Sequence, residues 1–335
     1  MKIVIRVDAH NEVALGHLNR CIALSSGLIE LENRVEFVVY NDESAIGLLD
    51  GSGLSFQTTQ HKINESGIFQ YDKSIISKIN PDILIIDSYY VDDQYINHMK
   101  EVAPFIVYLD DEGKNYNVDM VINPSCRANF LDYQSKIRLL GNQYTILSHI
   151  YWDQDPCYGL KKITSIMVTM GGVDHYNLSS LILKYLNKID NRLKVNMIIG
   201  PYYDNRNEIM DSISKSNLNV EVFEGLTNIY PVICMSDIAI SAGGVSVYEL
   251  AATSTPMIGI SLWENQKNNI KCLSSSKALL PLYYSSKIKF NNELFLSMKE
   301  IISNSTLRNS MAESGRRYVD GQGVRRISLE INKLK

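Results

Sequence analysis

Residues 241–260 read SAGGVSVYELAATSTPMIGI, and this stretch decides the fold class. It predicts a strand ending at Ser241, a turn over the glycine pair, a helix over Val245–Ala252 and a second strand over Met257–Ile260. Two strands joined by a helix run parallel, because the helix carries the chain back to the end where the first strand began. We therefore expect a parallel α/β unit with a glycine loop at the carboxyl end of a strand.

The same strand pattern recurs along the chain. Runs such as DILIID and PFIVYLDD are continuously apolar rather than alternating, which is typical of strands buried on both faces of a sheet. Further strands are expected at Lys2–Val7, Val35–Tyr40, Ile83–Asp87, Phe105–Asp110, Met120–Asn123, Ser165–Met170, Lys194–Ile199, Val220–Glu224 and Ile238–Ser241. Two such series predict an α/β protein with two Rossmann-like domains facing a central cleft.

The domain boundary is expected near residue 151. A chain of 335 residues suits two domains of about 100–200 residues each. Residues 151–162 form an irregular stretch with a proline, a glycine and several charges, which predicts a linker between domains at 1–150 and 163–335. Amphipathic helices are expected at Asn291–Asn304 and Ser305–Tyr318, and the last helices could pack back on the N-terminal domain.

Composition excludes several classes of protein. With 45% hydrophobic and 21% charged residues and a net charge of −4, the chain is not disordered and lacks the basic character of a nucleic-acid or membrane-surface binder. The N-terminus does not read as a signal peptide, and no apolar run is long enough for a membrane span. The five cysteines have no CxxC spacing and predict reduced thiols, with neither a metal site nor a cofactor. We expect a cytoplasmic protein, monomeric or weakly dimeric.

The first candidate loop follows the opening strand, in RVDAHNEVALGHLNRCIAL (residues 6–24). Gly16 and His17 stand where a helix should begin. The partial positive charge of a helix start suits an anion and would keep His17 neutral, as a general base requires. A histidine that merely caps the helix is the plainer alternative. Around it, the candidate substrate-binding residues are Gly16, Arg6, Asp8 and Arg20, with Asp87 and Tyr89 from the end of the DILIID strand.

Two glycine pairs mark the second half. Gly171 and Gly172 in TMGGVDHYN, and Gly243 and Gly244 in SAGGVSVYEL, each follow a strand and precede a helix, so their backbone N–H groups can approach a phosphate. Asp174 is expected to cap the helix after the first pair. The remaining candidates are Ser246 and Glu249, of which Glu249 could hold ribose hydroxyls or make a surface ion pair, and Asn265 and Gln266, which could bind sugar groups or cap a helix.

Taken together, the loops resemble a known family. RVDAHNEVALGHLNRCIAL, with its G-H-x-x-R helix start, then LIIDSYYVD, YLDDEG, TMGGVD and SAGGVSVYELAA fall in the order found in the nucleotide-sugar hydrolase of the pseudaminic acid pathway. The chain is more distantly similar to MurG-type glycosyltransferases of GT-B fold. The resemblance implies a metal-independent, inverting hydrolase that releases UDP from a 2,4-diacetamido-2,4,6-trideoxyhexose.

In that hydrolase the histidine of the G-H-x-x-R motif activates water, which here is His17, and the bond broken is the C–O bond at the anomeric carbon. The resemblance places the diphosphate and uridine at the two glycine pairs and the ribose at Glu249. The alternatives are a GT-B glycosyltransferase with an acceptor hydroxyl in place of water, and a protein that binds a nucleotide sugar without turnover. The expected partner is a UDP-linked sugar.

Overall fold

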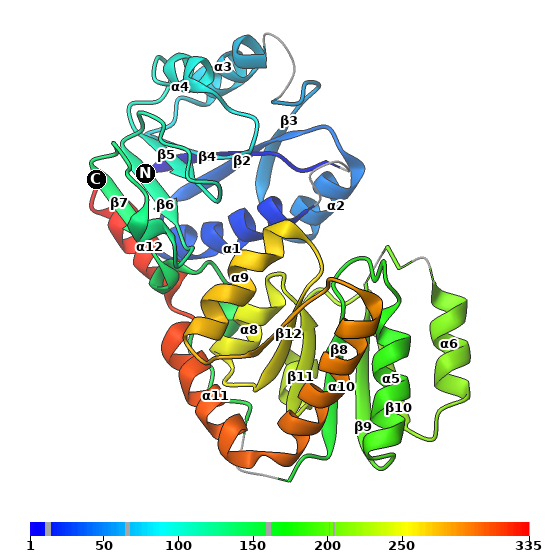
Figure 1. Ribbon diagram of the computed structural model, residues 1–335. Coiled ribbons are helices and arrows are strands. Elements are labelled where there is room, and N and C mark those ends of the chain that lie inside the picture. Colours follow the sequence, from blue (N-terminus) through cyan, green and yellow to red (C-terminus); the bar gives the residue numbers. More distant parts are fainter. Residues whose placement is uncertain (11–14, 64–67, 159–161, 201, 204, 335) are drawn as a thin grey trace. The chain divides into compact units, whose positions relative to one another are not determined.

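The computed structural model describes residues 1–10, 15–63, 68–158, 162–200, 202–203 and 205–334. Two compact units emerge from their contacts. Unit 1 comprises Met1–Trp152 and Gly321–Lys335, and unit 2 comprises Asp153–Asp320. Each unit is built around one parallel sheet (Figure 1).

Unit 1 contains a seven-stranded sheet in the order β3-β2-β1-β4-β5-β6-β7, with every neighbouring pair parallel. Its strands are β1 (Lys2–Val7), β2 (Arg34–Tyr40), β3 (Ser55–Thr59), β4 (Ile83–Asp87), β5 (Ile106–Leu109), β6 (Met120–Asn123) and β7 (Ile137–Leu140). Its α-helices are α1 (Gly16–Glu30), α2 (Glu43–Gly51), α3 (Ile68–Ile79), α4 (Asp93–Met99) and α12 (Gly323–Asn332).

Both faces of the central strands of unit 1 are buried, because side chains alternate between two clusters. Ile3 and Ile5 of β1 pack into a core that includes α1, α2 and α12, whereas Val4 packs into a core with α3 and α4. In the first of these cores, α1 lies beside α12 (Figure 1). This two-sided burial explains why the strands read as continuous apolar runs.

Unit 2 has a six-stranded parallel sheet in the order β10-β9-β8-β11-β12-β13. Its strands are β8 (Ser165–Thr169), β9 (Lys194–Ile199), β10 (Asn219–Glu224), β11 (Ile238–Ala242), β12 (Met257–Ser261) and β13 (Leu280–Tyr283). Its helices are α5 (Leu178–Ile189), α6 (Arg206–Ser214), α7 (Tyr230–Cys234), α8 (Ser246–Ala252), α9 (Glu264–Ser275), α10 (Lys287–Ser303) and α11 (Ser305–Tyr318).

Three strands that the sequence did not predict, β3, β7 and β13, all lie at edges of the two sheets. β3 has the polar sequence SFQTT, β7 is four residues long, and β13 contains Pro281. Edge strands are shorter and more polar than central ones and tolerate proline. The apolar-run criterion therefore finds all the central strands and, of the four edge strands, only β10.

The last helix belongs to unit 1 rather than to the unit that precedes it in the chain. Val324, Ile327 and Ile331 of α12 are fully buried in the core that α1 shares. The division expected at 150 and 163 allowed for the last helices to pack back on the N-terminal domain, and in the structure α12 packs in the core of unit 1. Unit 2 begins at Asp153, within the expected linker, and the chain returns to unit 1 at Gly321.

The prediction of reduced thiols was wrong for Cys157 and Cys234. These two residues form a disulfide although 77 residues separate them, and their Cα atoms are 4.8 Å apart. The spacing of cysteines along the chain does not reveal pairs that the fold brings together. Here Cys234 is the last residue of α7, and the backbone N–H of Cys157 donates to the carbonyl of Thr253. Cys21 is a buried free thiol.

The close packing of α1 on α12 predicts opposite effects for two helical glycines. A Cβ on Gly27 of α1 would lie 2.7 Å from atoms of Val324 and Ser328 in α12, whereas a Cβ on Gly47 of α2 has no described atom within 4 Å. Gly27→Ala should destabilise unit 1 by about 1–3 kcal/mol through overpacking. Gly47→Ala should stabilise it by up to about 1 kcal/mol, because alanine favours the helix.

Urea unfolding can report on unit 1 alone. The chain has two tryptophans, Trp152 in unit 1 and Trp263 in unit 2, so a Trp263→Phe background leaves Trp152 emission as the probe. If Gly27→Ala and Gly47→Ala shift the unfolding midpoint in the same direction, the packing described for α12 is incorrect.

Candidate active site

The polar residues of unit 1 gather where the strand order reverses. From β1 the chain proceeds to β2 and β3 on one side, and β4 to β7 follow on the other. Open α/β sheets bind ligands at the carboxyl ends of the strands at such a point. Asp8 directly follows β1, Asp87 ends β4, and α1 begins at Gly16, so the candidate residues come from the elements that meet there.

His17 and Asp87 form a buried pair. The His17 Nδ1 and Asp87 Oδ1 atoms are 2.6 Å apart, and the side chains are 7% and 0% exposed. α1 has no side-chain hydrogen bond at its N-cap, Leu15, so His17 does not act as a helix cap. The same Nδ1 atom lies 3.0 Å from Arg20 Nη2. In the tautomer with the proton on Nδ1, the ring donates a hydrogen bond to the ionised Asp87, and Nε2 is the acceptor nitrogen.

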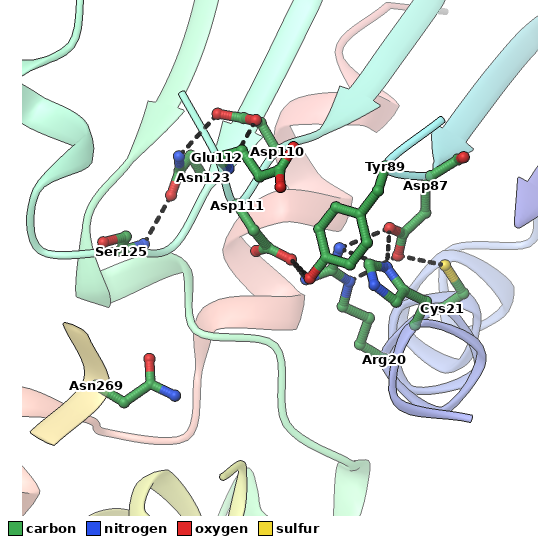
Figure 2. A network of polar contacts seen from close by, with 12 residues as sticks. Arg20, Cys21, Asp87, Tyr89, Asp110, Asp111, Glu112, Asn123, Ser125 and Asn269 are labelled. Atoms are coloured by element: carbon green, nitrogen blue, oxygen red, sulfur yellow. Dashed lines mark hydrogen bonds and ion pairs between the residues drawn. The ribbon is translucent and has the colours of Figure 1, made fainter. Parts of the chain in front are cut away.

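Arg20 lies one turn after His17 on α1 and contacts both oxygens of Asp87. Its Nε donates to Oδ2 at 2.6 Å and its Nη2 to Oδ1 at 2.5 Å. Its Nη1 donates to Asp111 Oδ2, also at 2.5 Å, from the loop after β5. Figure 2 shows Arg20, Cys21, Tyr89 and Asp111 around Asp87. The two-point guanidinium–carboxylate contact fixes the plane of the carboxylate that orients His17.

The charges around Asp87 keep it ionised. Burial by itself would raise the pKa of its carboxyl, but the positive charge of Arg20 and the hydrogen bonds from Arg20 and His17 outweigh burial and hold the pKa well below its usual value. Burial would likewise lower the pKa of Arg20, yet Asp111 and Asp87 raise it well above its usual value. The Asp87 carboxylate and its counter-ion Arg20 are therefore both charged at neutral pH.

Two further side chains complete the surroundings of His17. The Tyr89 ring meets the imidazole edge-on, with centroids 4.4 Å apart and planes at 90°, and the Tyr89 hydroxyl donates to Asp111 Oδ2 at 3.4 Å. Burial and the neighbouring Asp111 raise the pKa of Tyr89, so the phenol stays neutral. On the other side Cys21 Sγ donates to Asp87 Oδ2 at 3.3 Å, and burial raises the pKa of this thiol.

Arg6 and Asp8 belong to a second buried cluster rather than to the His17 pair. Arg6 Nε donates to Asp72 Oδ2 at 2.7 Å, its Nη1 is 3.7 Å from Asp8 Oδ1, and Ser88 Oγ donates to Asp8. Tyr95 also donates to Asp72. Burial raises the pKa of Asp8, against the opposing effect of Arg6. Arg6 is fully buried, so its principal contacts are within the protein.

The glycine pairs of unit 2 follow the two strands at which its strand order reverses. Gly171 and Gly172 come after β8, and Gly243 and Gly244 lie between β11 and α8. Gly171 has φ +77°, a conformation that side chains disfavour, and a Cβ on Gly243 would lie 2.8 Å from Ile270. The backbone at both loops therefore depends on glycine, with a helix start behind each.

Local capping accounts for some of the sequence candidates of unit 2. Asp174 caps α5, because its carboxylate accepts from the N–H groups of Leu178 and Ser179 at 2.8 Å each, as predicted. Gln266 Oε1 accepts from the N–H of Leu262 at 2.9 Å, which is the structural alternative considered for it. Ser246 and Glu249 lie half-buried in the first turn of α8, and the side chain of Asn265 is outside the described residues.

Cys21, Asp72 and Tyr95 contribute to these clusters and were not candidates from the sequence. Cys21 lies four residues after His17 and therefore on the same face of α1, which was a usable signal. Asp72 lies 66 residues from Arg6 in an amphipathic helix, α3, and nothing in the local sequence marks it as buried. A buried carboxylate of this kind is identified only by the charge that it pairs with.

The described part of the chain contains neither a candidate metal site nor a candidate membrane span. Among these residues there is no group of three or more His, Cys, Asp or Glu side chains that could hold a metal ion. None of the helices described there combines the length and apolar character needed to cross a bilayer.

Comparison with known proteins bears first on the fold. Residues 165–320, nearly all of unit 2, match the glycosyltransferase family 28 C-terminal domain. MurG of Acinetobacter baumannii superposes with a TM-score of 0.75 over 99% of this chain and all of that one, at 14% identity. The chain has the GT-B fold. The predicted fold class, α/β with two Rossmann-like domains of GT-B type, is confirmed to that extent.

Relatives in sequence are distant. SpsG of Bacillus subtilis, a spore coat polysaccharide biosynthesis protein, is 24% identical over 347 residues, which cover 100% of this chain and 98% of SpsG. The uncharacterized protein MJ1062 of Methanocaldococcus jannaschii is 23% identical over 274 residues, 77% of this chain but 55% of MJ1062. The chain thus spans about half the length of MJ1062.

These findings support a glycosyltransferase-like protein with a function related to nucleotide sugars. They favour the glycosyltransferase alternative over the hydrolase that the loop resemblance implied. UDP, the diacetamido sugar and the activation of water by His17 stay predictions.

The ionised state of Asp87 predicts a specific dependence of stability on pH. Asp87→Asn breaks a buried ion pair and should destabilise unit 1 by about 3 kcal/mol near pH 7. A carboxyl whose pKa is lowered by folding stabilises the protein above its unfolded pKa, 3.8, and this contribution is lost as the pH falls toward the folded pKa. The difference between wild type and Asp87→Asn should therefore shrink as the pH is lowered below about 4.

The measurement is urea unfolding followed by Trp152 emission in the Trp263→Phe background, from pH 7 down to about pH 2.5. Asp50→Asn, at an exposed position of α2, serves as the matched control and should stay within about 0.5 kcal/mol of wild type. A constant difference between wild type and Asp87→Asn over this pH range would contradict an ionised Asp87 in the folded protein.

Proposed function

We propose that this protein transfers the glycosyl group of a nucleotide sugar to a hydroxyl group, with His17 as the general base. The observation that carries the proposal is the 2.6 Å contact between His17 Nδ1 and Asp87 Oδ1, in a carboxylate that Arg20 holds ionised. The match of residues 165–320 to a glycosyltransferase domain favours transfer to an acceptor hydroxyl.

His17 supplies the proton acceptor. With Nδ1–H donated to Asp87, the Nε2 atom takes the proton of the attacking hydroxyl as its oxygen bonds to the anomeric carbon. The imidazolium that forms is stabilised by the neighbouring carboxylate, which stays ionised through its contacts with Arg20. General-base help of this kind contributes about 10²–10⁴-fold to the rate.

The glycine loops of unit 2 would bind the nucleotide. When the bond from the anomeric carbon to the diphosphate oxygen breaks, the electron pair stays on the leaving nucleoside diphosphate, and backbone N–H groups at a helix start can stabilise that charge. The loops after β8 and β11 have the open backbone that such an approach needs. Attack opposite the leaving group inverts the configuration at the anomeric carbon.

Hydrolysis is the second candidate. It is favoured by the G-H-x-x-R start of α1, which resembles that of the nucleotide-sugar hydrolase of the pseudaminic acid pathway. In that hydrolase water is the acceptor. Under this alternative the substrate is a UDP-linked 2,4-diacetamido-2,4,6-trideoxyhexose, and His17 takes its proton from water. The roles of Asp87 and Arg20 are the same in both reactions, so these residues do not distinguish the two.

Replacement of His17 tests the base. His17→Asn should lower kcat by about 10²–10⁴-fold while the KM for the nucleotide sugar changes little, because the imidazole acts only when the proton moves. Asp87→Asn should also lower kcat, since its amide can stabilise the wrong imidazole tautomer.

His98→Asn is the matched control, because His98 lies on α4 and bonds to Glu101 away from Asp87. It should keep wild-type activity. Full activity of His17→Asn with a correctly folded protein would rule out His17 as the base.

An acceptor assay separates transfer from hydrolysis. A panel of UDP-sugars is incubated in ¹⁸O-labelled water, with and without a mixture of hydroxyl acceptors, and the products are analysed by mass spectrometry. Release of UDP only when an acceptor is present supports transfer. Equal release without acceptor, with label in the free sugar, supports hydrolysis at the anomeric carbon, and label in UDP would contradict both.

Substitutions of the adjacent glycines 243 and 244 can distinguish an effect on loop packing from an effect on nucleotide binding. A Cβ on Gly244 has no described atom within 4 Å, so Gly244→Ala should leave the stability of unit 2 unchanged. If a phosphate approaches this backbone, the added methyl group should raise the Kd for UDP about tenfold or more, which isothermal titration calorimetry can measure.

Gly243→Ala is the comparison for the same loop. Its Cβ would lie 2.8 Å from Ile270, so this variant should destabilise unit 2 whether or not nucleotide is bound. Wild-type affinity of Gly244→Ala for UDP would remove the loop after β11 from the proposed phosphate site.

A further inference from the structure

Unit 2 has a groove that the proposed reaction does not use. It has a volume of about 650 Å³ and is bordered by α5, α6 and the start of α10. Cavities of about 300–1,000 Å³ are typical of small-molecule sites. α5 and α6 are neighbours in the fold (Figure 1). Both helices contribute residues to the lining of the groove.

The lining is basic in a chain that is acidic overall. Four lysines border the groove against one acidic residue, Glu208, whereas the whole chain has a net charge of −4. The lysines are Lys184 and Lys188 of α5, Lys215 at the end of α6 and Lys287 of α10.

Three of these lysines have no acidic partner among the residues that the structure describes. Lys215 pairs with Asp211 at 2.6 Å, but Lys184, Lys188 and Lys287 make no ion pair with any residue that the structure describes. Lys184 and Lys188 are one turn apart on the same face of α5, where like charges repel. A multiply charged anion in the groove would relieve this repulsion and satisfy all three ammonium groups.

One end of the groove is aromatic. Tyr176 and Tyr284 stack with centroids 3.9 Å apart, and His175 meets Tyr176 edge-on at 5.0 Å. A tyrosine offers an apolar ring face and a hydroxyl at its edge. A pyranose has the complementary arrangement, with C–H groups on the ring face and hydroxyls around it.

The groove is elongated and also carries amides. Along α5 it reaches from Asn177 to Lys188, about 16 Å at 1.5 Å per residue. Asn187 and Asn291 add side-chain amides, which can donate to and accept from sugar hydroxyls. The aromatic end, the amides and the separated lysines together suit a short chain of sugars with acidic groups better than a single compact anion.

We propose that this groove is a binding site for an acidic oligosaccharide, a short sugar chain that carries carboxylate or phosphate groups. The aromatic end holds the face of one sugar ring, and the lysines farther along α5 pair with the acidic groups of the following sugars. This site is distinct from the residues of the reaction proposed above, because the groove lies in unit 2, His17 and Asp87 belong to unit 1, and the glycine pairs are not among its lining residues.

Binding of trigalacturonate, a trisaccharide with three carboxylates, tests the site. Isothermal titration calorimetry at low ionic strength should detect binding that weakens as salt is added. Lys184→Ala/Lys188→Ala should raise the Kd by about tenfold per lysine, because each lysine supplies a charge-assisted hydrogen bond to an acidic group. Lys271→Ala, at an exposed α9 lysine that also makes no ion pair with a described residue, should bind as wild type does.

Neutral and sugar-free probes separate the two parts of the recognition. Maltotriose lacks the charges and tripolyphosphate lacks the sugars, so both should bind at least about tenfold more weakly. Tyr176→Leu should weaken trigalacturonate but leave tripolyphosphate unchanged. No binding of trigalacturonate, equal binding of tripolyphosphate or of single-stranded DNA, or an unchanged Kd for the double lysine variant would each overturn the proposal. Glycosyl transfer or hydrolysis by Lys184→Ala/Lys188→Ala should match wild type, so failure of the catalytic proposal would not affect this test.

Discussion

The buried ion pair between Arg20 and Asp87 is the interaction on which the candidate site of unit 1 depends. Burying a carboxylate is costly unless a charge and hydrogen bonds compensate, and Arg20 supplies both through two N–H groups. The carboxylate fixed in this way lies 2.6 Å from His17 Nδ1 and holds the orientation of the imidazole ring. The second link, from Arg20 to Asp111, ties the loop after β5 to the same helix.

How far this site could be predicted depended on the sequence separation between the residues that contact one another. His17, Arg20 and Asp87 stood out because a glycine–histidine helix start and an acidic strand end are local patterns, and parallel strands bring their carboxyl ends together. The contact between His17 and Asp87 spans 70 residues, so the sequence placed both at one sheet edge without pairing them. Arg6 was also a candidate because it lies near His17 in the sequence. Its guanidinium instead pairs with Asp72, whose burial no nearby residue indicates.

The fold followed a similar rule. Central strands such as β1 and β4 are buried on both faces, and their composition alone located them. The positions of the edge strands β3, β7 and β13, and the two points at which the chain passes from one unit to the other, depend on tertiary contacts instead. The segment before β8 joins unit 2 through the Cys157–Cys234 disulfide and the bond from Cys157 to Thr253, neither of which leaves a pattern in the neighbouring residues.

The return of the chain to unit 1 determines the order in which the hydrophobic cores of the two units can be completed during synthesis. Val324, Ile327 and Ile331 fill the core beside α1, so unit 1 exposes that apolar surface until residues beyond 320 have left the ribosome. Unit 2 is continuous in sequence, and all its strands have emerged by then. The half that is synthesised first is therefore the last to complete its core, and during that interval a chaperone would find its exposed surface on α1.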